Sequence, residues 1–347
     1  MGAGILRLVD AMEIQHLYDL RYNQAVKQHI IRCSWDDLAP HERSLVDAQQ
    51  MESCVKELLD TLIDRDDLAL VVKATSGDTF GYVLLTEHMN TWMGSLEGFA
   101  YGIHIDQGLE KNQVLQKLLD AIMNWARGHA YKFVRVEIPE RERTQALITY
   151  MSSLGWATSG LIPCKLLLSL ESASEGISLT HSEGITIRVA QERDYDFVIL
   201  SLAEAIWAGL SPAEKSQLSF DSLLENAHAD FKPSLRAGTS ISYVADSATQ
   251  GVCAQATAHV GFTHPILGIP EAELVDISIL PAFGGRGLGD QLTVNVLRAC
   301  FDRGIRFVRS NVVVENTTDD RVKQISQRIG RSGWWINSRI MYRSTSK

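Results

Sequence analysis

The stretch ISILPAFGGRGLGDQL, residues 277–292, places four glycines between an apolar strand pattern and a helical pattern. The strand is predicted to end at Pro281, and the helix is predicted to begin near Asp290. Glycine adopts positive φ readily and lets the backbone approach a ligand closely. Several N–H groups then point into one concavity at a helix N-terminus, where the helix dipole favours an anion. The stretch therefore predicts a phosphate-binding turn, to which Arg286 adds a positive charge.

Two better-known phosphate-binding turns fit this stretch poorly. No Lys-Ser or Lys-Thr pair follows the glycines, although a P-loop requires one. The turn also lies late in its half of the chain, whereas the glycines of a dinucleotide-binding fold follow the first strand. The sequence therefore points to a different class of phosphate ligand site.

The chain is predicted to form two domains joined by a linker. Residues 170–184 are dominated by Ser, Glu and Gly and interrupt the apolar periodicity on both sides. We therefore expect one domain over residues 1–169 and a second over residues 185–347.

The two predicted domains share one order of elements. Each begins with a short alternating strand, and each continues with a helical stretch, a strand pair, a long helix, a β-branched strand, a helix, a Gly-Trp pair and a last strand. From Ile5 to Gly155 is 150 positions, and from Ile185 to Gly333 is 148. This agreement indicates an internal duplication. The predicted strands are Ile5–Val9, Leu68–Lys73 and Phe80–Thr86 in the first half, and Ile185–Val189, Ser240–Ala245, Val252–Val260 and Phe307–Val314 in the second.

The second half resembles the GNAT superfamily of N-acetyltransferases. The family signature is a strand, a pattern like V-x-P-x-x-R-G-x-G-x-G and a helix, and here it corresponds to residues 279–289. Asn316 and the pair Gly333-Trp334 occupy the places of two further family features. The resemblance covers residues 185–343 well and residues 5–169 only by element order. It implies an α/β (α+β) fold with two GNAT-like domains, each a mixed, mostly antiparallel sheet flanked by helices.

The resemblance also implies acetyl-CoA or another acyl-CoA as co-substrate. Asn316 would reach the acyl or pantetheine end, and Gly284 stands where the family usually has Arg or Gln. In the first half the matching segment, residues 103–113, has a single glycine and two acidic residues, so this copy is predicted to be degenerate and to bind no cofactor. The strand end Ile279 and Leu280 would pair with the pantetheine arm, and the loop residues Gly284, Gly285, Arg286, Gly287, Leu288, Gly289 and Asp290 would surround the pyrophosphate.

Attack of an amine on a thioester requires a base that takes the amine proton. Glu273 and Asp276 are the candidate catalytic carboxylates, because members of the superfamily carry a base on the strand before the loop. Strict alternation along that strand would place them on opposite faces. The family's usual general acid is a tyrosine, but Ile329 or Ser326 stands at its place. Tyr243 and Tyr342 are the alternatives from elsewhere in the chain, and His259 and His264 are candidates for the acceptor site.

The net charge of −9 is unevenly distributed. Residues 171–280 carry 5 basic and 15 acidic side chains, whereas residues 281–347 carry 12 and 5. The basic end suits the phosphates of coenzyme A, and the acidic part suits a cationic acceptor, with the first half closing the acceptor cleft. The resemblance implies an N-acyltransferase, and this charge distribution favours a small, cationic amine as its acceptor. The alternatives are an acyl-CoA-binding regulatory module and a GNAT-like transferase with another donor or reaction, such as aminoacyl-tRNA, S-acyl transfer or decarboxylation.

Further expectations follow from composition. The five scattered cysteines form no metal-binding spacing, so no metal is expected. The N-terminus lacks a secretory signal pattern and no apolar run approaches the roughly 20 residues of a membrane span, so we expect a cytoplasmic protein without a membrane partner. The acidic net charge disfavours nucleic acid. The expected assembly is a monomer or homodimer, and the acceptor, the acyl chain and the general acid stay open.

Overall fold

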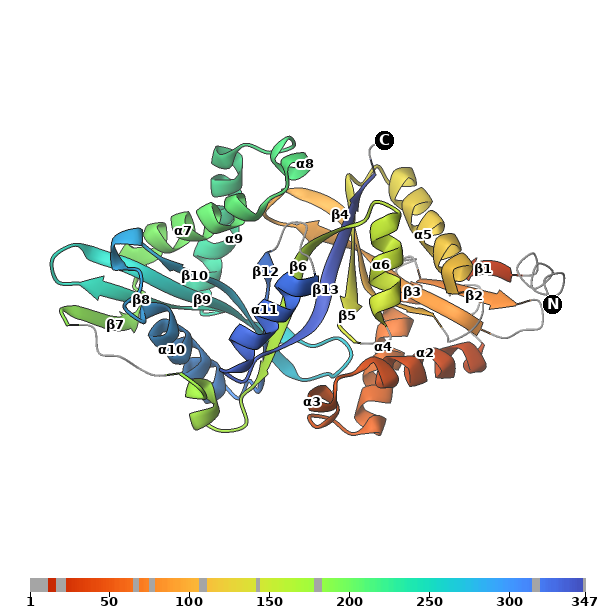
Figure 1. Cartoon of the computed structure of the whole chain (residues 1–347), viewed down its shortest axis with the longest axis horizontal. Helices are drawn as coiled ribbons and strands as arrows, with labels where there is room; N and C mark the ends of the chain where they lie inside the picture. The colour runs from red at the N-terminus through yellow and green to blue at the C-terminus, as the bar shows by residue number, and fades with distance from the viewer. Residues whose placement is uncertain are drawn as a thin grey trace.

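The computed structural model describes residues 12–16, 23–64, 69–74, 79–105, 111–141, 144–177, 183–313 and 319–345. Within these residues one 13-stranded sheet runs through the whole molecule, with helices on both of its faces (Figure 1). All strand pairs are antiparallel except β4 with β5 and β10 with β11. The expected fold class, a mixed and mostly antiparallel sheet flanked by helices, is therefore confirmed.

The first half supplies six strands and five helices of the described structure. Its strands are β1 Met12–His16, β2 Ala69–Ala74, β3 Thr79–Asn90, β4 Ser95–Ile105, β5 Phe133–Pro139 and β6 Ala157–Leu166. Its helices are α2 Gln24–Asp37, α3 Pro40–Arg43, α4 Ala48–Asp64, α5 Lys111–Gly128 and α6 Gln145–Ser153. Helices α5 and α6 bury their apolar side chains on one face of the sheet, and α2 and α4 cover the other face.

The second half repeats this plan. Its strands are β7 Ile185–Val189, β8 Ser240–Ser247, β9 Gly251–Thr263, β10 Pro270–Ile279, β11 Phe307–Ser310, β12 Val312–Val313 and β13 Trp335–Ser344. Its helices are α7 Tyr195–Gly209, α8 Pro212–Lys215, α9 Phe220–Ala237, α10 Leu288–Asp302 and α11 Asp319–Gly330. Helix α10 lies on one face over an alanine-rich core, and α7 and α9 cover the other. Among the described residues no helix is both long and apolar enough to cross a membrane.

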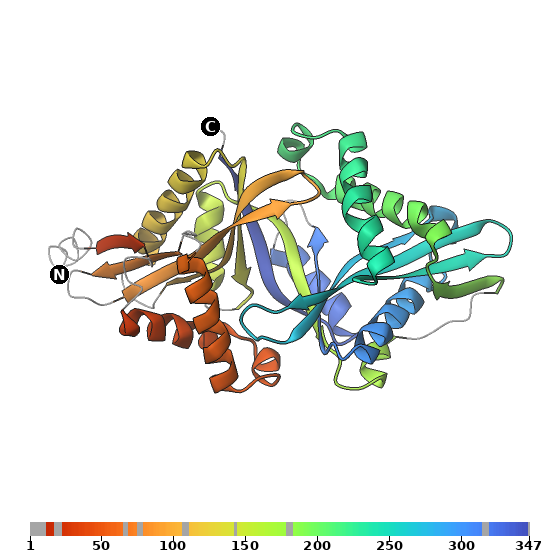
Figure 2. The ribbon, with the colours of Figure 1, turned by 180° about the vertical axis from the view of Figure 1, so that it is seen from behind.

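The two halves exchange their last strands. Strand β13, from the end of the chain, lies between β5 and β6, and β6 in turn pairs with β11 of the second half. Met341 of β13 is opposite Val136 of β5, and Cys164 of β6 is opposite Arg309 of β11. Both views show β13 and β6 together in the middle of the molecule (Figure 1 and Figure 2). The sheet is therefore continuous, although residues 170–184 separate the two halves in the sequence.

The duplication is visible in the detail of the backbone. In β4 a register shift leaves Tyr101 as the extra residue opposite β3, and in β10 an equivalent shift leaves Val275 as the extra residue opposite β9. The parallel partners of β4 and β10 both start with Phe-Val-Arg, at residues 133–135 and 307–309. Shared bulges at the same place in both copies support one ancestral plan, since bulges are specific features of a strand.

The structure differs from the predicted elements at three places. The strand predicted at Phe307–Val314 is divided into β11 and β12, because Pro163 on the facing strand β6 has no N–H to donate to the ladder. The segment predicted as a linker contains a short 3-10 turn whose Ala173 is fully buried in the core under α10. The strand predicted at Ile5–Val9 lies outside the described residues, and the described edge strand β1 comes later, at Met12–His16.

Strand exchange makes Met341 a test of the fold. Its side chain is fully buried in the core of the first half, although it belongs to the last strand of the chain. Met341→Ala is expected to lower the free energy of unfolding by about 2–5 kcal/mol, because it leaves a cavity. Met89→Ala, at a methionine that is 50% exposed, is the control and is expected to change it by about 0.5 kcal/mol at most. Urea unfolding of both variants measures this, and a loss at Met341 no larger than at Met89 would contradict the exchange.

Candidate active site

The glycine-rich turn joins β10 to α10 and has the geometry of an anion cradle. Gly285 and Gly287 have φ of +75° and +71°, which only glycine adopts without strain. Gly287 is the N-cap of α10, so the N–H groups of the next residues lie in the first turn of the helix, without partners inside it. At Gly289 a Cβ atom would lie 3.3 Å from the end of the Ile279 side chain, a tight contact that glycine avoids. These residues fit the pyrophosphate of an acyl-CoA.

The predicted loop residues do not all present a free N–H group to a ligand. The N–H of Gly284 donates to the carbonyl of Pro281 at 3.2 Å and closes a turn. The guanidinium of Arg286 lies over the ring of Phe283, 5.0 Å from its centroid, and remains on the exposed side of the loop. Helix α10 begins at Leu288, two residues before the predicted start at Asp290. Asn316 lies outside the described residues.

Strand β10 pairs with its parallel neighbour β11 only over its first half and diverges from it after Leu274. The pairing of β10 with β11 runs from Glu271 to Leu274, and the hydroxyl of Ser310 then donates to the Leu274 carbonyl at 2.7 Å. Residues 275–279 have no described strand partner on that side, over about 13 Å at 3.3 Å per residue. The open edge has backbone groups that an extended amide chain can pair with, and it connects the glycine cradle with the interior of the molecule.

The bulge at Val275 changes which way the two candidate carboxylates face. Glu273 is opposite His259 of β9, and Asp276 is opposite Thr257. Because His259 and Thr257 are two residues apart on β9, Glu273 and Asp276 lie on the same face of the sheet. The expectation of opposite faces was wrong, since strict alternation allows no extra residue in the strand.

Asp276 belongs to a buried polar network. Its carboxylate accepts hydrogen bonds from Ser278, at 2.5 Å, and from the Gln255 amide. The Thr257 hydroxyl is linked to Gln255 and to Ser242, at 2.7 and 2.8 Å. Burial raises the pKa of Asp276 to about 6, although the hydrogen bonds from Ser278, the Ile277 backbone and Gln255 oppose that rise. The side chain is fixed by these partners and does not line the cavity described next.

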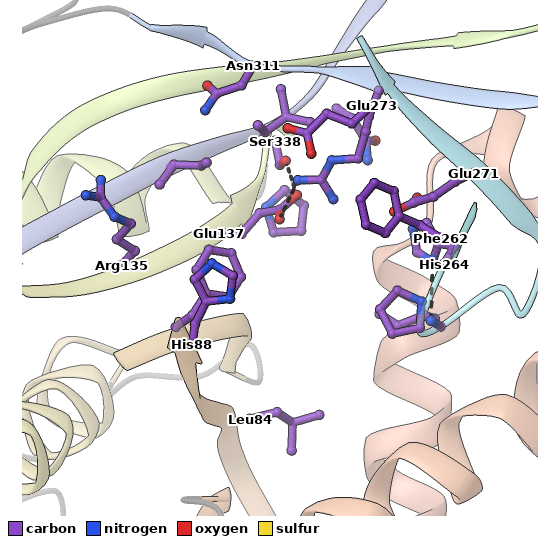
Figure 3. Close-up of a pocket in the computed structure, with 18 of the residues that line it drawn as sticks. Leu84, His88, Arg135, Glu137, Phe262, His264, Glu271, Glu273, Asn311 and Ser338 are labelled. Carbon is purple, nitrogen blue, oxygen red and sulfur yellow. Dashed lines mark hydrogen bonds and ion pairs between the residues drawn. The ribbon is translucent and has the colours of Figure 1, made fainter. Parts of the chain in front are cut away.

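A cavity of about 680 Å³ lies between the two halves, and both halves line it. Glu271, Glu273, Val275 and Arg309 form its wall on the second half. The first half contributes Glu137 and His88, among others, and β13 contributes Ser338. Figure 3 shows Glu273 and Glu137 pointing toward the same part of the cavity from opposite walls. Among its lining residues, seven are Asp or Glu and three are Arg, so the formal charge of the wall is −4 with neutral histidines.

Arg309 is the centre of the charged wall in the second half. Its guanidinium lies 3.4 Å from Glu137, which also accepts a hydrogen bond from Ser338. The Oε2 atom of Glu271 is buried and has no hydrogen-bond partner, and that residue is only 7% exposed. Burial raises the pKa of Glu271 to about 7, against the attraction of Arg309. Neither Glu271 nor Glu137 was predicted from the sequence.

The two candidate histidines and Tyr243 have structural roles. The Nδ1 atom of His264 accepts the N–H groups of Ile266 and Leu267, both at 3.2 Å, and burial lowers its pKa to about 3. This histidine lines the cavity as a neutral ring. His259 binds Ser240 at 2.6 Å and packs against a core phenylalanine. Tyr243 packs into the core under α10, on the face away from Asp276, and the side chain of Tyr342 lies outside the described part of the chain.

A second reactive cluster lies in the wall of the first half. The Cys33 thiol on α2 forms hydrogen bonds with His104 and His29, the latter at 3.5 Å, and Asp37 binds the Nδ1 atom of His104 at 3.0 Å. His104, Asp37 and Tyr82, whose ring stacks on His104, also line the cavity. Burial opposes ionisation of the thiol, but the two histidines outweigh it and lower the pKa of Cys33 to about 7. No group of three or more such side chains in the described ranges is arranged to hold a metal ion.

Comparison with known proteins finds similar structures but no similar sequences. No protein-family model matches the sequence, and no curated protein matches it. The structure is similar to a GCN5-related N-acetyltransferase from Sphaerobacter thermophilus, with a TM-score of 0.51 and 16% identity over 84% of this chain and 85% of that chain. It is also similar to the GCN5-related glucosamine N-acetyltransferase region of a fungal multi-domain GH3 β-N-acetylglucosaminidase, with a TM-score of 0.50 and 12% identity over 96% of this chain and 38% of that chain.

A tandem GNAT protein from the clavulanic acid biosynthesis pathway aligns with a TM-score of 0.45 and 14% identity, over 81% of this chain and 83% of that chain. The two likenesses with higher scores establish the fold. The chain has two GNAT-like halves, and the resemblance found in the sequence is confirmed at that level.

The Cys33 cluster predicts an unusually acidic thiol. The ultraviolet thiolate absorbance of the protein, minus that of Cys33→Ala, is expected to rise with a midpoint near pH 7, because both histidines favour the thiolate. His104→Gln is expected to move the midpoint upward by about one unit or more. His88→Gln, at another cavity histidine, is the control and is expected to leave it in place. A wild-type midpoint at the ordinary value of about 8.5 would contradict the cluster.

Proposed function

We propose that the protein is an acyl-CoA-dependent N-acyltransferase that transfers an acetyl or other acyl group to a small, cationic amine. One observation carries the proposal: a single strand, β10, joins a glycine cradle for phosphates to an acid-lined cavity between the two halves. The fold, which is that of GNAT N-acetyltransferases, supports the reaction class. The negative wall of the cavity supports a cationic acceptor.

The chain's own residues suit the two ends of an acyl-CoA. The N–H groups of Gly285, Leu288 and Gly289 would hold the pyrophosphate, with the positive end of α10 behind them. The open backbone edge of residues 275–279 would pair with the pantetheine arm and direct the acyl end toward Val275, where the cavity begins. The thioester supplies an acyl group that is activated for attack by an amine.

Glu273 is the residue that we propose takes the proton from the attacking amine. It lines the cavity, faces the acceptor space and lies two residues from the open edge of β10. Asp276, the other candidate, is held by Ser278 and Gln255 in the buried network and is a positioning residue for β10 in this proposal. The proton lost by the amine moves to the Glu273 carboxylate, and the thiolate leaves as the amide forms.

A thermal-shift titration with acetyl-CoA tests the cradle. The ligand at 100 times its dissociation constant stabilises the wild type by about 2.7 kcal/mol, which raises Tm by about 2–4 °C or more. Gly287→Glu is expected to abolish the shift, because a carboxylate with a strained backbone would stand at the phosphate position. Gly251→Glu is the matched control, since Gly251 has φ of +73° and open space around it but lies in the β8–β9 turn. Equal shifts in both variants would contradict the cradle.

Two isosteric variants separate the roles of the carboxylates. Glu273→Gln is expected to lower kcat by about 10²–10⁴-fold, the usual contribution of a general base. Asp276→Asn is expected to lower kcat less and to lower Tm more, because it disturbs the buried network. Release of free thiol from acetyl-CoA with an amine panel measures kcat. Acetyl-CoA binding without thiol release for any amine would contradict the transferase and favour an acyl-CoA-binding module.

A further inference from the structure

The duplication places two equivalent Glu-Arg sets on the cavity wall, Glu97 with Arg135 and Glu271 with Arg309. The parallel ladders fix this equivalence, because Phe99 is opposite Arg135 in the first half and Glu273 is opposite Arg309 in the second. Glu97, two residues before Phe99, is therefore the counterpart of Glu271, two residues before Glu273. All four charged members of these pairs line the cavity.

The pair in the first half is closed by a third residue. The Nε atom of Arg135 donates to Glu97 at 2.8 Å, and its terminal nitrogen donates to Glu214 of α8 at 2.6 Å. One oxygen of Glu97 also accepts a hydrogen bond from Asn90, at 3.3 Å, while its Oε2 atom has no partner. The guanidinium and the two carboxylates thus form one cluster across the two halves.

The pair in the second half is open. Arg309 turns to Glu137, 3.4 Å away, and Glu271 forms no described hydrogen bond or ion pair with it. Glu42 of α3 matches Glu214 as the third residue of a short helix that starts with proline. It accepts hydrogen bonds from Asn337 and the Ala39 N–H and lies 3.6 Å from Arg141, so it does not bind Arg309. Arg309 is near enough to attract Glu271, but Glu271 lacks the hydrogen-bonded guanidinium that Glu97 has in the first half.

The burial of Glu271 and the negative charge around it both favour a positively charged ligand beside its carboxylate. Glu271 is 93% buried, and an isolated buried carboxylate is costly unless a cation or hydrogen-bond donor meets it. Glu137, Glu271 and Glu273 surround Arg309, so this part of the wall has a formal charge of −2 with all three ionised. Glu42, on the neighbouring α3, adds to the negative potential at Glu271.

We propose that Glu271 binds a second ammonium group of the acceptor, so that the substrate is a diamine whose other nitrogen lies at Glu273. This inference rests on the proposed N-acyltransferase function. Glu271 and Glu273 are two residues apart on one face of β10, which separates them by about 6–7 Å. An unbranched chain of four or five carbons between the two nitrogens fits that spacing, and the two positive charges match the charge of the wall.

The test compares 1,4-diaminobutane with butylamine as acceptors for acetyl-CoA. The wild type is expected to have a kcat/KM for the diamine at least about tenfold above that for the monoamine, since the second ammonium meets a buried carboxylate. Glu271→Gln is expected to remove most of this preference. Glu97→Gln, at the counterpart in the first half, is the matched control and is expected to keep the preference, whatever it does to Tm.

The pH dependence gives a second measurement. The KM of the wild type for the diamine is expected to fall as pH rises through about 7, because deprotonated Glu271 binds the ammonium group. The charged groups that face Glu271 are Arg309, Glu137, Glu273 and Glu42. Glu271→Gln is expected to lose this component. If the glutamine variant does not fold, Glu271→Asp is used: it is expected to keep the pH dependence and to raise the KM for the diamine, because its carboxylate is one methylene farther from the ammonium group.

The outcomes distinguish the two proposals. Turnover of both amines with equal kcat/KM in the wild type and in Glu271→Gln would overturn the diamine inference and leave the transferase standing. Absence of thiol release with every amine would overturn the proposed function. In that case a diamine-binding site would still be assigned if 1,4-diaminobutane raises the Tm of the wild type but not that of Glu271→Gln. The absence of any Tm shift in the wild type would overturn the diamine-binding site as well.

Discussion

The insertion of β13 between β5 and β6 is the interaction on which the rest of the structure depends. A GNAT-like half without its last strand would leave β5 with an open edge, and each half closes that edge with a strand from the other. The two halves therefore cannot separate without breaking the ladders on both sides of β13. The same pairing brings the wall of β5 and the wall of β10 together around one cavity.

Duplication followed by specialisation accounts for the asymmetry of the two halves. The second half has the glycines that the phosphate cradle needs, whereas the matching segment of the first half carries acidic residues in the sequence. The first half contributes Glu137 and the Cys33 cluster to the shared cavity instead. The equivalent Glu-Arg pairs also differ between the halves. In the first half Arg135 binds both Glu97 and Glu214, whereas in the second half the Oε2 atom of Glu271 has no hydrogen-bond partner.

The sequence predicted the local features and missed those that depend on distant residues. The glycine turn, the helix after it and strand β7 were predictable, because positive φ and apolar periodicity are properties of neighbouring residues. The bulge at Val275 was not, and it decides the faces of Glu273 and Asp276. Strand exchange has no local signal, since β5 and β13 lie some 200 residues apart in the sequence. Aligning the repeated Phe-Val-Arg at 133 and 307 would have identified Arg309 and its neighbours as a second copy of the Arg135 cluster.

Amide hydrogen exchange of the full chain tests the central claim that the two halves share one continuous sheet. If β13 is inserted between β5 and β6, the amides of residues 338–344 exchange as slowly as those of β5, because they open only when both halves open. Edge strand β7 provides the internal reference for a strand that is paired on one side. Exchange in β13 as fast as in β7, with β5 still protected, would contradict the shared sheet and the cavity that depends on it.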